Sequence, residues 1–164
     1  MDYYGKIAEG YDELHGEEQR RKLAIIQNSI KTKKGTKILD IGCGTGISSN
    51  FECFVAGIDP SRGLLKQNKS KRKVLGAAES LPFRNNVFDY VVCMTAMHNF
   101  HDVKKSLEEM KRVCNGSFAI TILRRSKKFG RIKKMIEEEF KVYDLKEEDK
   151  DVILFCRKPA AFKM

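Results

Sequence analysis

The sequence has no run of apolar residues long enough to cross a bilayer, and its first residues do not resemble a signal peptide. We therefore expect a soluble, cytoplasmic protein. Its five cysteines include no C-x-x-C pair and mostly lie within apolar runs, which indicates neither a zinc site nor a disulfide framework. They are predicted to be small core residues in a reducing compartment.

The chain is also too short to hold a second domain. Its 164 residues, 41% of them hydrophobic, suit one domain with a full core, and no internal repeat or low-complexity tract divides them. We predict a single domain over residues 1–164, with an arm and helix over 1–34 and the core over 35–164. The net charge of +10 favours polyanionic partners, but a lysine-rich surface that serves only solubility would give the same value.

What the sequence does contain is a run of β-formers that leads directly into closely spaced glycines. Residues 37–41 precede a loop over 42–46 with glycine at its first, third and fifth positions. Glycines in this pattern let a buried strand turn sharply and let the backbone approach a ligand. Asp40 would place a carboxylate beside that ligand. We interpret this stretch as the binding loop of a nucleotide cofactor.

A second apolar run, over residues 53–58, ends in Asp59. An inner parallel strand ends in this way when its last side chain faces a ribose. The segment between the two strands, residues 47–52, has room for a helix of roughly two turns. Asp59 is therefore the second candidate for a cofactor contact.

Strands and helices alternate along the rest of the chain. A helix is expected between Asp102, which would cap it, and Asn115-Gly116, which would end it. Other helices are predicted over 17–30, over 61–73 and from 129 onward. Further strands are predicted over 74–77, 88–94 and 117–123, followed by a hairpin of 140–145 with 152–157. This pattern predicts an α/β fold in three layers, a doubly wound, mostly parallel sheet of seven strands with a C-terminal antiparallel hairpin.

Five motifs follow one another in a fixed order: residues 38–46, 57–59, 78–83, 88–92 and 109–113. Together they closely resemble class I S-adenosylmethionine-dependent methyltransferases and their Rossmann-like fold. Within these, the chain is most similar to the type 11 group, which contains the ubiquinone and menaquinone biosynthesis enzymes, and its Tyr11-Asp12 is similar to that group as well. The resemblance covers almost the whole chain.

The resemblance implies that the cofactor is S-adenosyl-L-methionine and that no metal is needed. The glycine loop would pass beneath the cofactor, Asp40 would orient its methionine end, and Asp59 would accept hydrogen bonds from the ribose hydroxyls. Ala77 stands where the family usually has an aspartate beside the adenine, so that Glu79 or backbone groups must take its place. The residues expected to bind the cofactor are Tyr11, Asp40, Gly42, Cys43, Gly44, Gly46, Asp59, Pro60, Ala78 and Glu79.

Methyl transfer requires few catalytic groups from the protein, because the sulfonium of the donor is already activated. The enzyme holds the acceptor in line and, where needed, removes a proton from it. The loop over 95–101 follows the fourth strand and would line the donor methyl, which makes His98 and Thr95 the candidate catalytic residues. The alternative is that His98 is an ordinary surface residue. Tyr4 or Tyr11 could fold over the site as a lid.

The acceptor is expected to be RNA, such as tRNA. Four cations, Arg124, Arg125, Lys127 and Lys128, follow the fifth strand at the sheet edge where ligands bind, and the lack of an inserted lid predicts an open mouth. Two alternatives stay open: a small molecule bound beneath the first sixteen residues, and a non-catalytic cofactor-binding subunit of a heterodimer. A homodimer or a partner subunit could also supply recognition. A nicotinamide-dependent oxidoreductase fits less well, because Gly46 comes one position too early for G-x-G-x-x-G.

Overall fold

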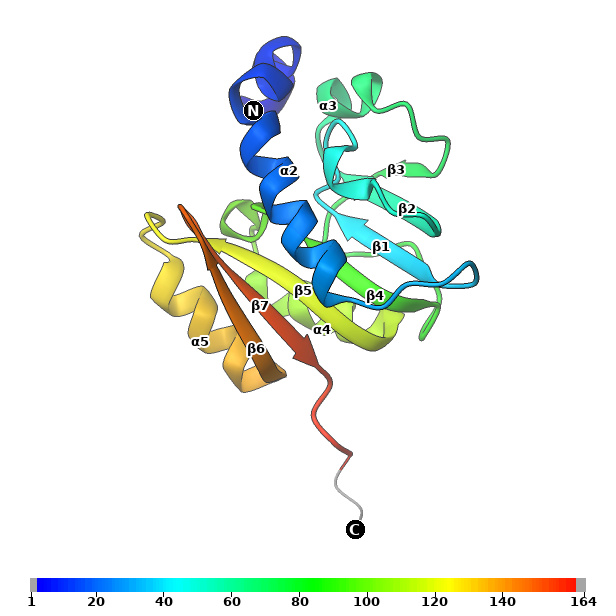
Figure 1. Ribbon diagram of the computed structural model, residues 1–164, viewed down its shortest axis with the longest axis vertical. Coiled ribbons are helices and arrows are strands. Elements are labelled where there is room, and N and C mark those ends of the chain that lie inside the picture. The colour runs from blue at the N-terminus through cyan, green and yellow to red at the C-terminus, as the bar shows by residue number, and fades with distance from the viewer. Residues whose placement is uncertain (1–2, 162–164) are drawn as a thin grey trace.

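Seven strands pair into one sheet within residues 3–161, the part of the chain that the computed structural model describes (Figure 1). Their order across the sheet is β3-β2-β1-β4-β5-β7-β6. The first five strands run parallel, whereas β7 pairs antiparallel with both β5 and β6. The bounds are β1 Lys37–Ile41, β2 Phe54–Asp59, β3 Lys73–Leu75, β4 Phe88–Cys93, β5 Cys114–Leu123, β6 Lys141–Glu148 and β7 Asp151–Arg157. The predicted sheet, with its C-terminal hairpin, is confirmed.

Helices cover both faces of this sheet. The long helix α2 lies across one face, and α4 and α5 pack on the other (Figure 1). The helices are α1 Tyr3–Ile7, α2 Tyr11–Ser29, α3 Arg62–Gln67, α4 Val103–Val113 and α5 Phe129–Glu139, with single 3₁₀ turns over 8–10, 47–49 and 97–99. No helix within residues 3–161 is both long and apolar enough to span a membrane.

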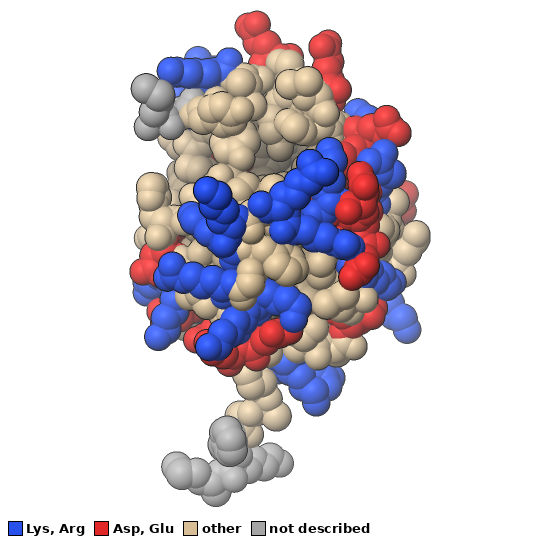
Figure 2. All heavy atoms as spheres, turned by 90° about the vertical axis from the view of Figure 1, so that its left-hand side faces the viewer, with Lys and Arg blue, Asp and Glu red and all other residues tan. Residues whose placement is uncertain are grey.

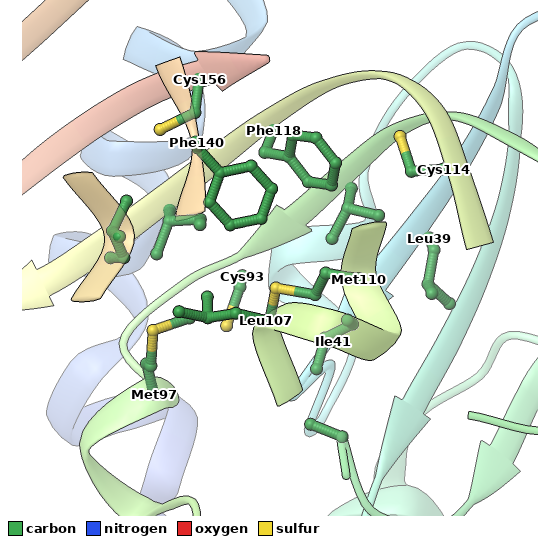
Figure 3. Packing of buried hydrophobic residues seen from close by; sticks show 14 of the residues in the cluster. Leu39, Ile41, Cys93, Met97, Leu107, Met110, Cys114, Phe118, Phe140 and Cys156 are labelled. Carbon is green, nitrogen blue, oxygen red and sulfur yellow. The ribbon is translucent and has the colours of Figure 1, made fainter. Parts of the chain in front are cut away.

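Alternate residues of each central strand face the two helical layers. Leu107 and Met110 of α4 pack with Phe118 of β5 and with Phe140, as Figure 3 shows, and the two phenyl rings lie 4.5 Å apart between centroids. On the opposite face, Ile26 of α2 packs in a second cluster with residues of β1, β2, β4, β5 and β7. Each such fully buried side chain stabilises the fold by roughly 1.5–3 kcal/mol, so that the strand ends which carry the site are held rigidly.

Five predicted features differ from the observed ones. Residues 47–52 contain only a 3₁₀ turn, since the Ser48 and Ser49 hydroxyls turn back to donate to Asp40. The helix predicted over 61–73 ends at Gln67, where Asn68 leaves the helical conformation and its side-chain amide donates to the carbonyl of Gly44.

The other three differences concern the first long helix, the start of β5 and the C-terminal hairpin. The first long helix begins at Tyr11 instead of residue 17, preceded by α1 and a 3₁₀ turn. Asn115-Gly116 does not separate α4 from the next strand but lies inside β5, because β5 already pairs with β4 at Cys114 and a bulge there absorbs the extra residues. The hairpin turn is also tighter than predicted, with only residues 149–150 between β6 and β7.

Candidate functional site

The loop after β1 adopts a backbone conformation that requires glycine. Gly42, Gly44 and Gly46 have φ of +76°, +48° and +98°, in the left-handed region. A Cβ on Gly42 would also lie 2.5 Å from the Cβ of Ala96, closer than two carbon atoms can approach. The backbone N–H groups of Gly42 and Cys43 donate to the carbonyl of Ile58, at 2.8 and 3.1 Å. The loop is thus fixed to the end of β2, as the motif predicts.

Asp40 lies wholly buried in β1, just before this loop. The hydroxyls of Ser48 and Ser49 each donate to its Oδ2 at 2.6 Å, whereas its Oδ1 has no hydrogen-bond partner among the described residues. Burial raises the pKa of Asp40 to about 6. A buried carboxylate with one unpaired oxygen is costly alone, and a cationic ligand group would offset that cost.

Asp59 ends β2 and ties two loops together. Its Oδ2 accepts the N–H of Gly44 at 2.9 Å, and its Oδ1 accepts the N–H of Ser61 at 2.7 Å. Ser61 in turn caps α3, accepting the N–H of Leu64. A carboxylate oxygen can accept more than one hydrogen bond, so these contacts do not prevent Asp59 from also meeting a ligand hydroxyl. Asp59 is therefore both a support for the glycine loop and a potential ligand contact.

A cavity of about 90 Å³ lies between these loops. Five parts of the chain line it: the glycine loop, the end of β2, α3, the exit of β4 and the N-terminal segment. The lining residues are Tyr4, Tyr11, Gly42, Gly44, Asp59, Pro60, Leu64, Met94, Thr95, Ala96, Asn99 and Phe100. Of the glycines and acids predicted from the motifs, this set contains Gly42, Gly44 and Asp59 but neither Gly46 nor Asp40, and it adds Leu64 and Met94, which were not among the predicted cofactor contacts.

The N-terminal segment forms a roof over this cavity. The Asn99 side-chain amide donates to the Tyr4 hydroxyl at 2.7 Å, and the rings of Tyr4 and Tyr11 meet edge to face with centroids 6.1 Å apart. The Thr45 hydroxyl donates to Asp12 at 2.6 Å, which fastens the start of α2 to the glycine loop. Burial raises the pKa of Tyr11 to about 12, so that its hydroxyl stays protonated. Tyr4, Tyr11 and Asn99 border the cavity on one side, where a lid formed by Tyr4 or Tyr11 would lie.

The exit of β4 places Thr95 and His98 near this cavity in different ways. Thr95 lines it, has a φ of +52°, and accepts a hydrogen bond from the buried Lys22 ammonium at 2.7 Å. His98 is half-buried and does not line the cavity. Burial lowers the pKa of His98 below its ordinary value, which favours the neutral imidazole that can accept a proton.

Several predicted cofactor residues lie outside the cavity. Gly46 and Cys43 belong to the same loop but border neighbouring depressions, and burial raises the pKa of the Cys43 thiol. Ala78 is buried in the core, and the Glu79 carboxylate accepts the backbone N–H groups of His101 and Asp102, at 2.8 and 3.2 Å. Their roles in cofactor binding stay predictions. Within residues 3–161, no group of three or more His, Cys, Asp or Glu side chains could hold a metal ion.

The predicted cation cluster lies between β5 and α5. Arg124, Arg125, Lys127 and Lys128 are all exposed, and Figure 2 shows Lys and Arg gathered on the side of the molecule where α5 lies. Arg124 is paired with Glu147 at 3.0 Å, and the Lys128 ammonium donates to the carbonyl of His98 at 3.0 Å. Part of this charge is therefore used within the chain itself.

The chain is similar to known proteins over the region that holds these motifs. Residues 39–120 match the model of a methyltransferase domain family. An uncharacterised protein of Methanocaldococcus jannaschii is 37% identical over 128 residues, which cover 74% of this chain and 50% of that protein. A demethylmenaquinone methyltransferase of Renibacterium salmoninarum is 34% identical over 110 residues, which cover 62% of this chain and 46% of that enzyme. The chain spans about half the length of the curated relatives it matches.

Solved structures share the whole fold. One is a chain of the complex between the Haloferax volcanii Trm112 methyltransferase activator and a proposed methyltransferase, with a TM-score of 0.78, 14% identity, and coverage of 97% of this chain and 99% of that one. Another is a SAM-dependent methyltransferase from Thermotoga maritima, with a TM-score of 0.74, 16% identity, and coverage of 95% and 98%. At these identities the likeness extends to the fold alone. Because the family model covers half of the chain and agrees with its motifs, the chain belongs to the class I S-adenosylmethionine-dependent methyltransferases of the ubiquinone and menaquinone type, whose cofactor is S-adenosyl-L-methionine.

Proposed function

We propose that this protein transfers a methyl group from S-adenosylmethionine to a small acceptor molecule. The observation that carries the proposal is the buried Asp40, whose Oδ1 lacks a partner among the described residues, beside a glycine loop that leaves no room for a side chain. The donor supplies a cationic sulfonium that carries the transferable methyl group. A buried carboxylate next to a bare backbone surface suits a nucleoside with cationic groups.

Each part of the cavity has a proposed task. The backbone of Gly42 and Gly44 bears the donor, and Asp59 accepts hydrogen bonds from its ribose while keeping the loop in place. Asp40 is wholly buried beside the loop and does not line the cavity, and its proposed task is to pair with the positively charged amino-acid end of the donor. The Tyr4 and Tyr11 roof excludes water. The remaining predicted contacts are those of Cys43, Gly46, Pro60, Ala78 and Glu79.

His98 is the proposed proton acceptor for an acceptor molecule that must lose a proton. Its imidazole is kept neutral by burial, and the Lys128 ammonium at its backbone carbonyl holds the loop that carries it. The hydroxyl of Thr95 is directed to the charged side chains of Lys22 and Asp151, which supports a positioning role for Thr95 in place of a catalytic one.

A small acceptor is favoured over RNA for two reasons. The N-terminal roof covers the cavity, which leaves less access for a large ligand, and the relatives include demethylmenaquinone methyltransferases. The comparisons do not support the preference for RNA drawn from the four cations, which stays a prediction. The activator complex among the similar structures makes a partner subunit a further subject for testing.

Calorimetry with S-adenosylhomocysteine tests the donor site. We expect the protein to bind this product, and Asp59→Ala to weaken binding at least about tenfold, which is the loss of about 1.4 kcal/mol from one charged hydrogen bond. The matched control is Asp144→Ala, which removes an exposed carboxylate on the outer strand β6. A parent protein that does not bind, or equal affinity in all three proteins, would overturn the donor assignment.

The acceptor class is tested by incubating the protein with methyl-labelled donor and fractionated cell extract. We expect the label to enter small metabolites. Label in RNA that disappears in Arg124→Glu, Arg125→Glu would instead favour the reading from the cation cluster. Donor binding without transfer to any fraction, with or without a copurified partner, would favour a non-catalytic subunit.

A further inference from the structure

Lys22 is an unusual residue for the interior of this protein. It lies in α2, on the face that packs against the sheet, and its side chain is 0% exposed. A lysine side chain is almost never fully buried unless its charge is paired. Its ammonium donates to Glu18 at 3.1 Å, to the Thr95 hydroxyl at 2.7 Å and to Asp151 at 2.6 Å. All three of its N–H donors are therefore used, which a buried ammonium requires.

The partners of Lys22 come from distant parts of the chain. Asp151 begins β7, in the C-terminal hairpin, and Thr95 follows β4. Asp151 is also 0% exposed, and its Oδ2 accepts from both Lys22 and the Thr95 hydroxyl. The first long helix and the last strand thus meet at one residue of the loop that leaves β4.

Thr95 is held in a conformation that its residue type rarely adopts. Its φ is +52°, in the left-handed region, where a β-branched side chain is a genuine outlier. Three contacts fix it: the hydroxyl accepts from Lys22 at 2.7 Å and donates to Asp151 at 3.0 Å, and the backbone N–H donates to the Thr121 hydroxyl at 2.7 Å.

The conformation of Thr95 decides where the next residue lies. Ala96 packs so closely on the glycine loop that a Cβ on Gly42 would be 2.5 Å from its own Cβ. Thr95 and Ala96 both line the cavity, as do Gly42 and Asp59. A change in the backbone at Thr95 would therefore move one wall of the cavity relative to the glycine loop.

We propose that the buried Lys22–Asp151 ion pair is a positioning device that holds Thr95 in its left-handed conformation and thereby sets the wall of the donor cavity. The inference rests on the proposed function in one respect, that this cavity binds the methyl donor. Lys22 and Asp151 act through Thr95 and do not touch the donor themselves. A buried ion pair contributes little net stability compared with apolar side chains of similar size, so stability alone gives a weak reason for its presence.

The test removes both charges together. The double variant Lys22→Met, Asp151→Leu leaves neither charge unpaired in the interior. We expect its unfolding midpoint to stay close to that of the parent, while its affinity for S-adenosylhomocysteine in calorimetry falls at least about tenfold. The matched control is Lys150→Met, which removes an exposed lysine that also pairs with Glu18 but has no contact with Thr95.

A glycine at position 95 supplies the decisive measurement. Glycine adopts a positive φ without strain, so it needs no ion pair to hold it there. Thr95→Gly is expected to restore most of the affinity for S-adenosylhomocysteine that the double variant has lost. In the parent, the same substitution should not raise this affinity. A role in stability alone would not give this rescue.

Two results would overturn the inference. One is a double variant that binds S-adenosylhomocysteine as tightly as the parent. The other is a Thr95→Gly substitution with the same effect in both backgrounds. If the double variant does not fold, Asp151→Asn, which keeps the side-chain shape, takes its place in the same comparison with Thr95→Gly. Failure of the proposed function is distinguishable, since the parent itself would then not bind.

Discussion

Replacing Asp40 by asparagine should weaken donor binding and at the same time stabilise the ligand-free protein. Burial raises the pKa of Asp40 from its ordinary value of 3.8 to about 6. Above pH 6 the folded protein therefore carries a charge that the unfolded chain accommodates more easily. A pKa difference of about 2, at about 1.4 kcal/mol for each pH unit, means that the charged Asp40 lowers the free energy of unfolding by about 3 kcal/mol.

Asparagine removes this cost without changing the shape of the side chain. Its amide oxygen can still accept the hydroxyls of Ser48 and Ser49. We expect the free energy of unfolding at pH 7, measured by urea denaturation, to rise by about 1–3 kcal/mol. In the parent, the contribution of Asp40 to stability is greatest below pH 4 and decreases as the pH rises to about 6, because the folded state holds the proton longer. The variant should lack this decrease.

Donor binding should change in the opposite direction. A charged hydrogen bond contributes about 1.5–3 kcal/mol, which corresponds to a loss of about 10- to 150-fold in affinity for S-adenosylmethionine in calorimetry. The parent should also bind more tightly as the pH rises through 6, and the variant should not. The control is Asp89→Asn, since the Asp89 carboxylate accepts the N–H of Lys37 at the far end of β1, away from the glycine loop. Parent-like affinity in Asp40→Asn, or a loss of stability, would refute the reasoning.

Three further predictions concern the loop, the roof and the proton acceptor. Gly42→Ala should lower both the unfolding midpoint in thermal denaturation and the donor affinity in calorimetry, because an added Cβ would lie 2.5 Å from the Cβ of Ala96. Gly10→Ala is the control and should leave both quantities unchanged, because a Cβ at Gly10 would have no neighbour within 4 Å. Asn99→Ala removes the hydrogen bond to Tyr4 and should speed release of a bound donor analogue a few-fold in stopped-flow measurements, and an unchanged release rate would show that the roof does not confine the donor. Methyl transfer that needs His98 should stay constant from pH 8 down to about 6.5 and fall only below it, since the pKa of His98 is lowered, and a fall already above pH 7 would contradict its role.

Much of the site could be predicted because its parts lie within short segments of the chain. The β-run before three glycines allows only a strand followed by a tight loop, and an apolar run that ends in Asp59 allows only a strand whose last residue reaches the same sheet edge. In a parallel sheet these ends lie side by side, so local pattern and topology together place the loop next to the acid. The left-handed φ values required glycine at positions that the motif already supplied.

The sequence could not indicate which charged residues become buried. Lys22 lies within the amphipathic pattern of α2, and a lysine between Arg21 and Leu23 would normally be solvated. Only the pairing of β7 with β5 brings Asp151 to the exit of β4. The ion pair with Asp151 then offsets the free-energy cost of burying the Lys22 ammonium. The place of the N-terminal roof could not be predicted for the same reason, because the roof depends on the contact between Tyr4 and Asn99, 95 positions apart.

By itself, the sequence determined the order of strands and helices, the glycine loop and the two acids near it, since these follow from backbone conformation and from the periodicity of apolar residues. Only the tertiary structure decided which side chains close the cavity and how Thr95 is held. Those contacts join residues far apart in the chain, and their energies depend on burial, which no local pattern specifies.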